Sequence, residues 1–282
     1  MAQQNQPSSY KHGHSDHTIS THLLRTAETE AAFLLPHIKK TDHILDVGCG
    51  PGTITIGLAQ RASEGRTVGI DISAGVLQKA KTVAAEADVP TEGPGSVVFE
   101  EGNILGRLAY PDNTFDVVYA AHVFGHFPPP DLPLQALAEI RRVLKPGGVL
   151  ATRDAAAQHF FPRSIGLDRL WVGNFTRVVH NGDPDADLTG TIMPAMFLRA
   201  GFDADRIRVG AAAQMRSAPE DRRWLAARAA GQLGEGDPFR QNWLDAGITE
   251  DEIRQTVLAA EKWAETEGAW SAALHCEMLA WK

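Results

Sequence analysis

Residues 43–53 read His43-Ile-Leu-Asp-Val-Gly-Cys-Gly-Pro-Gly-Thr53. A short apolar run, typical of a buried strand, ends beside an acid and opens into glycines at alternate positions, after which a helical pattern begins. Glycine permits positive φ angles and a close approach of backbone to ligand, and the start of the following helix offers free N–H groups. The segment therefore predicts a strand, a sharp turn and a helix beneath a bound nucleotide-like ligand.

Strand and helix patterns alternate from this segment to residue 154, which indicates a parallel, doubly wound α/β sheet. An amphipathic helix over residues 19–35 precedes the alternation and stops at Pro36. The expected strands are residues 44–47, 67–71, 96–100, 115–121 and 149–153, and the expected helices are residues 53–62, a helix capped by Ser73, and a helix opened by Asp131-Leu-Pro133.

The pattern changes after Asp154, but no linker or repeat separates a second domain. We expect a flexible tail or lid over residues 1–17 and one domain over residues 18–282, in which residues 43–154 form the ligand-binding core. Inserted helices at residues 155–200 and 217–267 are expected to form a cap. The detailed expectations are two helices in 155–200 broken at Asn181-Gly-Asp-Pro184, strands at 205–215 and 269–281, and helices at 219–233 and 249–266.

Composition excludes several classes of protein. The 282 residues are 43% hydrophobic with a net charge of −8, so a packed core is expected and nucleic acid is not an expected partner. The first 17 residues are polar, and no apolar run approaches the ~20 residues that cross a bilayer, which predicts a cytoplasmic protein with no membrane partner. Two cysteines without a CxxC pair exclude a disulfide or zinc framework.

The glycine spacing separates ligand classes. A P-loop needs Gly-Lys-Ser/Thr, and a dinucleotide fingerprint needs its third glycine one residue later than Gly52, so an NAD-dependent dehydrogenase is disfavoured. Asp46 is unfavourable beside a pyrophosphate and favourable beside an ammonium group. Asp71, at the end of the second expected strand, suits a ribose diol. These residues predict a nucleoside ligand with an amino-acid tail.

Five motifs follow one another along residues 43–154. They are Asp46-Val-Gly-Cys-Gly-Pro-Gly52, Gly69-Ile-Asp71, Glu101-Gly-Asn103, Pro111-Asp-Asn-Thr-Phe-Asp116 and Arg141-Arg-Val-Leu-Lys-Pro-Gly-Gly148. Their order is typical of class I S-adenosylmethionine-dependent methyltransferases, which this chain resembles. The resemblance implies a Rossmann-like class I methyltransferase fold, with a seven-stranded, mostly parallel sheet flanked by helices and an inserted helical cap. It also implies S-adenosyl-L-methionine as cofactor and S-adenosyl-L-homocysteine as product.

The resemblance implies cofactor contacts at the matching positions. Many relatives carry Asp where this chain has Asn103, which leaves the adenine contact there open. The implied contacts are Asp46, Gly48 and Gly50 along the methionine part, Asp71 and Ile72 at the ribose and adenine, and Gly102, Asn103 and Ile104 at the adenine amino edge.

Residues upstream of the glycines narrow the resemblance to one branch of the family. Tyr10, His22-x2-Arg25-Thr-Ala-Glu28, Leu34-Leu-Pro36 and the end Ala280-Trp-Lys282 are similar to ubiquinone- and menaquinone-biosynthesis methyltransferases and their fungal secondary-metabolism relatives, such as gliotoxin bis-thiomethyltransferase. This implies that the upstream helix folds over the cofactor, that Arg25 or Thr26 holds its carboxylate, and that Tyr10 closes the site. The alternative for Arg25 is a surface arginine on an amphipathic helix.

The candidate catalytic residues are His126, His122, Tyr10 and Asp154. Histidine titrates near neutral pH and loops after strands display reactive groups, so His126 is expected beside the acceptor and His122 as a backbone contact to the cofactor. Either histidine alternatively packs as a structural residue. Asp154, at the end of the fifth expected strand, is expected to face the acceptor. Alternatively it is a buried residue whose carboxylate caps backbone N–H groups.

Three other features of the sequence bear on its function. His12, His14 and His17 do not favour a metal site, because a flexible tail offers no ordered groups to orient the ligands, and no metal is expected. Pro128-Pro-Pro130 lies too far past its strand and lacks the leading amide or acid of nucleic-acid amino methyltransferases. The apolar residues of the insertion form either core or the roof of an acceptor pocket, and they are Phe160, Phe161, Trp171, Phe175, Met193 and Met196.

We therefore predict methyl transfer to a small-molecule acceptor by a monomer or weak homodimer. The resemblance to fungal secondary-metabolite enzymes favours S-methylation of a thiol or dithiol, with O- or C-methylation of a phenol or quinol as the alternative. A different class stays open, which is a non-catalytic S-adenosylmethionine-binding protein that regulates a partner.

Overall fold

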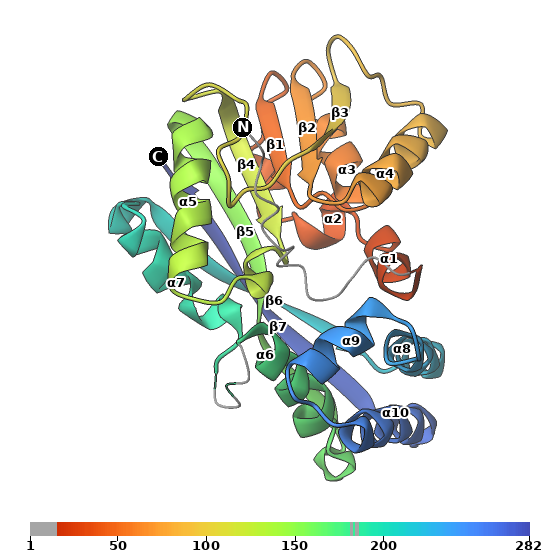
Figure 1. The fold of residues 1–282 in the computed structure, drawn as a ribbon. Helices are drawn as coiled ribbons and strands as arrows, with labels where there is room; N and C mark the ends of the chain where they lie inside the picture. The colour runs from red at the N-terminus through yellow and green to blue at the C-terminus, as the bar shows by residue number, and fades with distance from the viewer. Residues whose placement is uncertain (1–15, 181–182, 184–185) are drawn as a thin grey trace, which may run out of the picture.

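The computed structural model describes residues 16–180, 183 and 186–282, with side chains described from Ile19 onward. Seven strands form one sheet in the order β3-β2-β1-β4-β5-β7-β6 (Figure 1). Only β7 runs antiparallel to its neighbours, which confirms the predicted Rossmann-like, mostly parallel sheet. The strands are β1 (His43–Val47), β2 (Arg66–Asp71), β3 (Ser96–Glu101), β4 (Phe115–Ala121), β5 (Leu144–Phe161), β6 (Ile207–Arg216) and β7 (Trp270–Trp281).

Helices cover both faces of the sheet, and the expected cap of α4 is confirmed, because Ser73 Oγ accepts a hydrogen bond from Val76 N at 3.3 Å. The α-helices are α1 (Asp16–Leu23), α2 (Ala27–Glu30), α3 (Thr53–Arg61), α4 (Ala74–Glu86), α5 (Asp131–Val143), α6 (Asn174–Val179), α7 (Thr189–Arg199), α8 (Pro219–Gln232), α9 (Pro238–Asp245) and α10 (Glu250–Glu265). Short 3-10 or π turns are η1 (Leu35–His37), η2 (Phe124–His126), η3 (Arg163–Ile165), η4 (Asp168–Gly173) and η5 (Ala204–Arg206).

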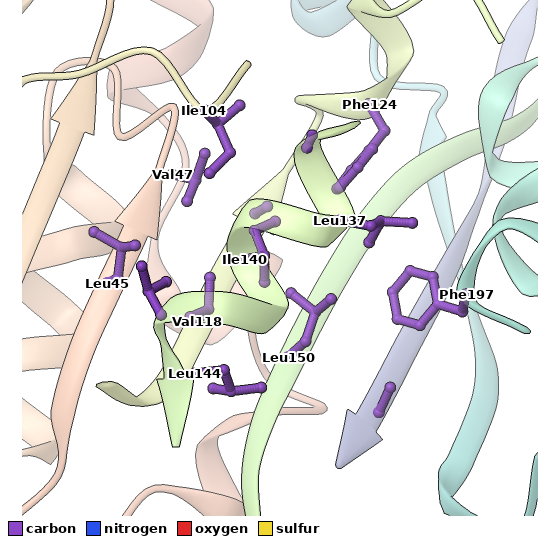
Figure 2. Close-up of a cluster of buried hydrophobic side chains, with 14 of the residues drawn as sticks. Leu45, Val47, Ile104, Val118, Phe124, Leu137, Ile140, Leu144, Leu150 and Phe197 are labelled. Atoms are coloured by element: carbon purple, nitrogen blue, oxygen red, sulfur yellow. The ribbon is translucent and has the colours of Figure 1, made fainter. Parts of the chain in front are cut away.

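Alternation along the central strands divides the core between two faces. Leu45 of β1 and Val118 of β4 belong to the cluster that includes Leu137 of α5 and Phe197 of α7 (Figure 2). Their neighbour Ile44 belongs to the cluster under α2 and α3. Successive side chains of a strand point to opposite faces, so strands buried on both sides are apolar throughout. This double covering leaves the carboxyl ends of the strands as the place for a ligand.

The expected end of the fifth strand at Arg153 is wrong, as is the expected helix from Ala155. β5 continues to Phe161, and β7 pairs with it from Val149↔Trp281 to Phe161↔Trp270. Strand pairing satisfies the backbone hydrogen-bonding groups of residues 155–161, and this tertiary pairing overrides the helical tendency of their alanines. The long strands carry the sheet well beyond its parallel part.

Helices α6, α8, α9 and α10 gather around this extension of β5, β6 and β7 (Figure 1). α9 corresponds to no predicted element, and Asp237 caps it by accepting a hydrogen bond from Phe239 N at 2.8 Å. α8 also packs against α1, which brings the cap helices next to the amino-terminal segment. Residues of α6 and α8 line one cavity together with residues at the carboxyl ends of β1, β2 and β4.

The expected single helix over residues 19–35 is wrong, because the segment divides into α1, α2 and η1. Thr26 restarts the helix through a capping box, in which its Oγ1 accepts from Thr29 N at 3.3 Å and its own N–H donates to Thr29 Oγ1 at 3.1 Å. A side chain that caps a helix competes with helix continuation through the same residue. The break turns α1 away from α2 and toward α8.

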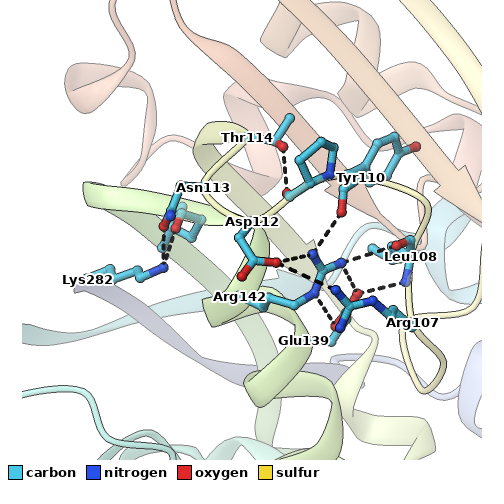
Figure 3. A network of polar contacts seen from close by, with 11 residues as sticks. Arg107, Leu108, Tyr110, Asp112, Asn113, Thr114, Glu139, Arg142 and Lys282 are labelled. Atoms are coloured by element: carbon cyan, nitrogen blue, oxygen red, sulfur yellow. Dashed lines mark hydrogen bonds and ion pairs between the residues drawn. The ribbon is translucent and has the colours of Figure 1, made fainter.

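Arg142 of α5 fastens the loop between β3 and β4 (Figure 3). Its guanidinium donates to the carbonyl oxygens of Tyr110 at 2.8 Å and Leu108 at 3.2 Å, and it pairs with Glu139 at 2.6 Å and Asp112 at 2.8 Å. One side chain thus satisfies backbone groups that have no strand partner. This fixes the loop that follows the end of β3.

Candidate active site

The turn between β1 and α3 forms one end of the main cavity. Gly48, Gly50 and Gly52 have φ values of 69°, 53° and 82°, a region that L side chains rarely adopt. A Cβ on Gly48 would lie 2.7 Å from Val123 Cγ2, whereas one on Gly50 would meet only His22 Nδ1, at 3.9 Å. Gly50 and His22 both line the cavity. The turn therefore leaves its backbone open to a ligand.

Asp46 lies in the cavity lining at the end of β1 and is only 3% exposed. Thr55 Oγ1 donates a hydrogen bond to its Oδ2 at 2.6 Å. Burial, opposed by this hydrogen bond and reinforced by the negative charge of Asp71, raises the pKa of Asp46 to about 7. A cation placed beside Asp46 would favour its charged form. The site thus offers a buried carboxyl group to an ammonium group.

Asp71 joins the end of β2 to the glycine turn. Its Oδ2 accepts from Gly50 N at 3.1 Å and its Oδ1 accepts from Ser73 N at 3.0 Å. A carboxylate has about four lone-pair sites, so both oxygens keep further acceptor capacity. Asp71 and the next residue, Ile72, line the cavity. This places a hydrogen-bond acceptor beside the open turn.

The residues after β3 line the same cavity. Gly102 N donates to Asp71 O at 3.0 Å, and Asn103 Oδ1 accepts from Leu105 N at 2.9 Å. Ile104 is 4% exposed and packs in the central core close to Val47 (Figure 2). The carboxyl ends of β1, β2 and β3 therefore bring the expected cofactor contacts together.

The amino-terminal segment contributes Arg25 and His22 to the cavity lining, but not Thr26. Thr26 is exposed, and its hydroxyl caps α2. Of the two residues expected to hold the cofactor carboxylate, only Arg25 therefore lines the cavity. Burial, followed by the charges of Arg25 and Arg228, holds the pKa of His22 well below its usual value. Thr53 Oγ1 donates to His22 O at 3.3 Å and ties α1 to the start of α3.

His122 follows β4 with a φ of 56°, and its Nε2 lies 3.2 Å from Glu30 Oε2. Burial and the charge of Arg25 lower the pKa of His122 to about 3, so the neutral ring donates its Nε2–H to Glu30. Arg153 Nε lies 3.1 Å from the same oxygen and the guanidinium also pairs with Glu277. Burial opposes ionisation of Glu30, but the hydrogen bond from His122 and the charges of Arg25 and Arg153 bring its pKa to about 2. This network connects α2 to the end of β4 and to the middle of β5, at Arg153.

His126 and Asp154 face the cavity beyond the glycine turn, and they are 8% and 1% exposed. Asp154 Oδ1 accepts from Gly125 N at 3.1 Å, whereas its Oδ2 has no hydrogen-bond partner among the described residues. Burial, opposed by hydrogen bonds from the backbone of Gly125 and Phe124, raises the pKa of Asp154 to about 8. At neutral pH this residue is therefore a carboxylic acid, able to donate a hydrogen bond.

Asp154→Asn is expected to become more stable relative to the wild type as pH rises. The folded chain keeps the Asp154 proton up to about pH 8, whereas an unfolded chain loses it near about pH 4, so unfolding becomes easier with rising pH between these values. The isosteric amide removes this dependence. Urea denaturation from pH 5 to 9 should show the difference growing by up to about 1.4 kcal/mol per pH unit and levelling off above about pH 8.

A stability difference that does not change with pH would contradict the raised pKa of Asp154. Asp46 shifts in the same direction, but it is present in both proteins and its contribution cancels in the comparison.

The cavity continues from Asp154 beneath the cap helices and has a volume of about 340 Å³. Its sheet side includes Gln158, Ala273 and Gln214, which are paired across β5, β7 and β6. The helical side is mostly apolar, as is usual for a small-molecule pocket. The residues that η4, α6 and α8 contribute are Trp171, Phe175, Thr176, Val179, Trp224, Leu225 and Arg228.

Only two of the six expected roof residues, Trp171 and Phe175, line this cavity. Phe160 packs edge-on against Trp263 with ring centroids 5.2 Å apart, and Phe161 stacks on Trp270 at 4.3 Å. Both lie on β5 rather than on a helix, which turns them away from the roof. Met193 and Met196 belong to the central core beside α5.

Several lining residues were missed by the sequence prediction. Gln214 and Arg216 are two residues apart, so on a strand they lie on the same face. Only the pairing of β6 with β7 shows that this face borders the site. Other lining residues that were missed include Gln158, Trp224, Leu225, Arg228, Ser271, Ala273 and His275. Glu30 does not line the cavity, and it was missed because its role depends on its contacts with His122 and Arg153.

Two predictions fall outside the described ranges. Tyr10 lies there, as do His12, His14 and the side chain of His17. Within the residues that the structure covers, no group of three or more His, Cys, Asp and Glu side chains is placed to hold a metal.

Comparisons with known proteins agree on one family. A methyltransferase domain family matches residues 44–148. The chain is 64% identical over 285 aligned residues, with 100% of both chains covered, to the Aspergillus luteorubrus protein named "Probable methyltransferase ltbC". It is 33% identical over 220 residues, 77% of each chain, to "Uncharacterized methyltransferase C1B3.06c" of Schizosaccharomyces pombe. The YcgJ structure from Bacillus subtilis has the same fold, with a TM-score of 0.54, 18% identity and coverage of 89% of this chain and 97% of the other.

Proposed function

We propose that this chain, which belongs to the class I S-adenosylmethionine-dependent methyltransferases, methylates a small molecule bound in the same cavity as the donor. One observation carries the proposal. A single cavity joins the open glycine turn and Asp71 to a second compartment where His126 and Asp154 face the space beneath α6 and α8. Donor and acceptor sites that share one enclosed space allow direct transfer with water excluded.

The residues at the first compartment fit S-adenosylmethionine. Bound there, the cofactor supplies an electrophilic methyl group on a sulfonium and leaves as S-adenosylhomocysteine. We assign its amino-acid part to the backbone of Gly48 and Gly50, with its ammonium group near Asp46. The ribose hydroxyls are assigned to Asp71, and the adenine to the residues that follow β2 and β3, which are Ile72, Gly102, Asn103 and Ile104.

The electrostatics of the second compartment favour an acceptor that ionises easily. Asp154 is protonated at neutral pH and His122 donates its Nε2–H to Glu30, which leaves His126 as the candidate to accept a proton. A thiol with a pKa of about 8.5 needs little help, whereas a phenol near about 10 needs more. We therefore propose S-methylation of a thiol or dithiol of fungal secondary metabolism, with O- or C-methylation of a phenol or quinol as the alternative.

Matched acceptors test this proposal. The full chain is incubated with donor labelled at the methyl group and with aromatic thiols, dithiols and the corresponding phenols, and labelled products are separated by mass. We expect product from thiols at higher kcat/KM than from the matched phenols. Faster turnover of the phenols would favour the alternative, and donor binding without product from any acceptor would favour a non-catalytic binding protein.

His126→Ala is expected to lower turnover while leaving donor affinity nearly unchanged. Loss of a general base typically lowers kcat by about 10²-fold or more, and the deficit should shrink above about pH 8.5, where a thiol ionises unaided. Steady-state rates from pH 6 to 9.5 and calorimetric titration with S-adenosylhomocysteine give the two readouts. Equal losses of rate and affinity would make His126 a structural residue or a cofactor contact.

We also propose that the protein is cytoplasmic and that it is a monomer or a weak homodimer. No helix in the described ranges is long and apolar enough to span a bilayer.

A further inference from the structure

The cavity wall farthest along the sheet from the glycine turn is polar. Gln214 pairs with Ala273 and Arg216 pairs with Ser271 between β6 and β7, and Gln158 of β5 pairs with the same Ala273. Residues paired across strands lie side by side on one face of a sheet. All five line the cavity. Two amides, a hydroxyl and a guanidinium therefore present hydrogen-bonding groups from one sheet surface.

Arg216 gives this wall its charge. Its guanidinium lies over the ring of Trp224 of α8, 5.5 Å from the ring centroid, and no ion pair joins it to a carboxylate within the described part of the chain. Arg228 lies one helical turn after Trp224 and lines the same cavity. Its charge, after burial and the charge of Arg25, contributes to the lowered pKa of His22. Arg216 and Arg228 thus both contribute positive charge to the cavity lining.

Only one acid lines the acceptor compartment. Among the described lining residues the carboxyl groups are Asp46 and Asp71, from the ends of β1 and β2 in the donor compartment, and Asp154, from within β5 in the acceptor compartment. Asp154 is neutral at neutral pH because burial raises its pKa to about 8. The wall around Arg216 consequently has positive charge, and no ionised acid stands among the described lining residues of the acceptor compartment. Such a surface attracts an anion.

Rings face the polar wall from the helical side. Trp171 of η4, Phe175 of α6 and Trp224 of α8 line the cavity. Flat aromatic side chains pack against flat ligands, and an arginine held over an aromatic ring keeps its planar edge free for a carboxylate. The compartment therefore suits a ligand with a flat apolar body and a polar, anionic edge.

We propose that the acceptor is a planar, conjugated molecule that carries a carboxylate or similar anionic group in addition to the atom that receives the methyl group. Arg216 binds the anionic group, while Trp171, Phe175 and Trp224 contact the conjugated body. A bidentate guanidinium–carboxylate pair fixes orientation as well as adding affinity. The inference rests on the proposed function, because it names the substrate class of the same cavity.

Isosteric probes test the charge requirement. Aromatic acids and their neutral primary amides, namely 2-sulfanylbenzoate, 6-hydroxy-2-naphthoate and the two matching amides, are titrated calorimetrically into the full chain saturated with S-adenosylhomocysteine. We expect at least one acid to bind 10-fold or more tightly than its amide, a difference of about 1.4 kcal/mol. Arg216→Met should abolish this preference.

Arg208→Met is the matched control. Arg208 lies on the same strand, and its guanidinium is 5.0 Å from the ring centroid of Trp281, but it does not line the cavity. The control should keep the preference for the acid. Both variants should bind S-adenosylhomocysteine as the wild type does, because neither position belongs to the donor compartment.

Three results would overturn the inference. They are equal binding of acids and amides by the wild type, a preference that survives Arg216→Met, and failure of all acids to bind while S-adenosylhomocysteine binds normally. Each of these leaves the donor part of the proposed function intact. Failure of S-adenosylhomocysteine itself to bind would instead contradict the proposed function, and the inference with it.

Discussion

Gly50→Ala is expected to weaken S-adenosylmethionine binding by about 10- to 100-fold, the effect of overfilling a packed site by one methyl group. The added Cβ meets no protein atom closer than His22 Nδ1 at 3.9 Å, so it collides with a ligand rather than with the chain. The φ of Gly50 is 53°, which also costs the folded state about 1 to 2 kcal/mol when Ala replaces Gly. Calorimetric titration measures the affinity and urea denaturation measures the stability.

Gly147→Ala separates these two contributions. Gly147 has a φ of 78°, and nothing lies within 4 Å of its added Cβ, but it does not line the cavity. We expect a similar loss of stability in this variant and wild-type affinity for the donor. Equal affinities of Gly50→Ala and Gly147→Ala would show that the glycine turn does not contact the cofactor.

Arg153→Met is expected to lower the free energy of unfolding by about 3 to 5 kcal/mol, the usual effect of breaking a buried ion pair. Arg153 is 4% exposed, its Nε lies 3.1 Å from Glu30 Oε2, and its guanidinium also pairs with Glu277. Removal of this side chain therefore leaves two acids close together without the cation that they share. Arg254→Met is the surface control. Arg254 pairs with Asp251 where their side chains are 72% and 55% exposed, and such pairs contribute less than about 1 kcal/mol.

The loss of unfolding free energy in Arg153→Met should depend on pH. In the wild type the pKa of Glu30 is about 2, below its unfolded value, so this carboxylate stabilises the fold above about pH 4.5 and the contribution is lost as pH falls toward 2. Without Arg153 the pKa of Glu30 rises, and the difference between the two proteins shrinks on acidification. Urea denaturation at pH 7 and pH 4 measures this. A deficit that is equal at both pH values, or no larger than that of Arg254→Met, would contradict the role assigned to Arg153.

The residues expected to contact the donor line one cavity, and this grouping was predictable because its determinants are local. Gly48 and Gly50 follow a strand directly, and Asp71 ends the next one, so parallel pairing alone brings them to one edge of the sheet. The same reasoning places Ile104, which follows β3, at that edge. Asp154 lines the same cavity, although β5 continues past it to Phe161. Thr26 shows where this reasoning fails, because its hydroxyl takes part in a capping box with Thr29 and does not line the cavity.

The acceptor compartment depends on pairings that no local pattern reveals. Residues 155–161 have helical composition, and their partner β7 lies more than a hundred residues later in the chain. The extension they form is what brings Arg216 and Trp224 to the site. Glu30 and Arg153 likewise gain their roles only when α2 packs against β4 and the middle of β5.

Titration of S-adenosylmethionine into the wild type, Asp71→Ala and Asp71→Asn is the most direct test that the ends of β1 and β2 hold the donor. We predict saturable binding at one site per chain in the wild type. Loss of the acceptor oxygens of Asp71 should weaken binding in Asp71→Ala by about 1 to 3 kcal/mol, or about 5- to 150-fold, and Asp71→Asn should fall between the two. No binding by the wild type, or equal affinity in all three proteins, would contradict this account.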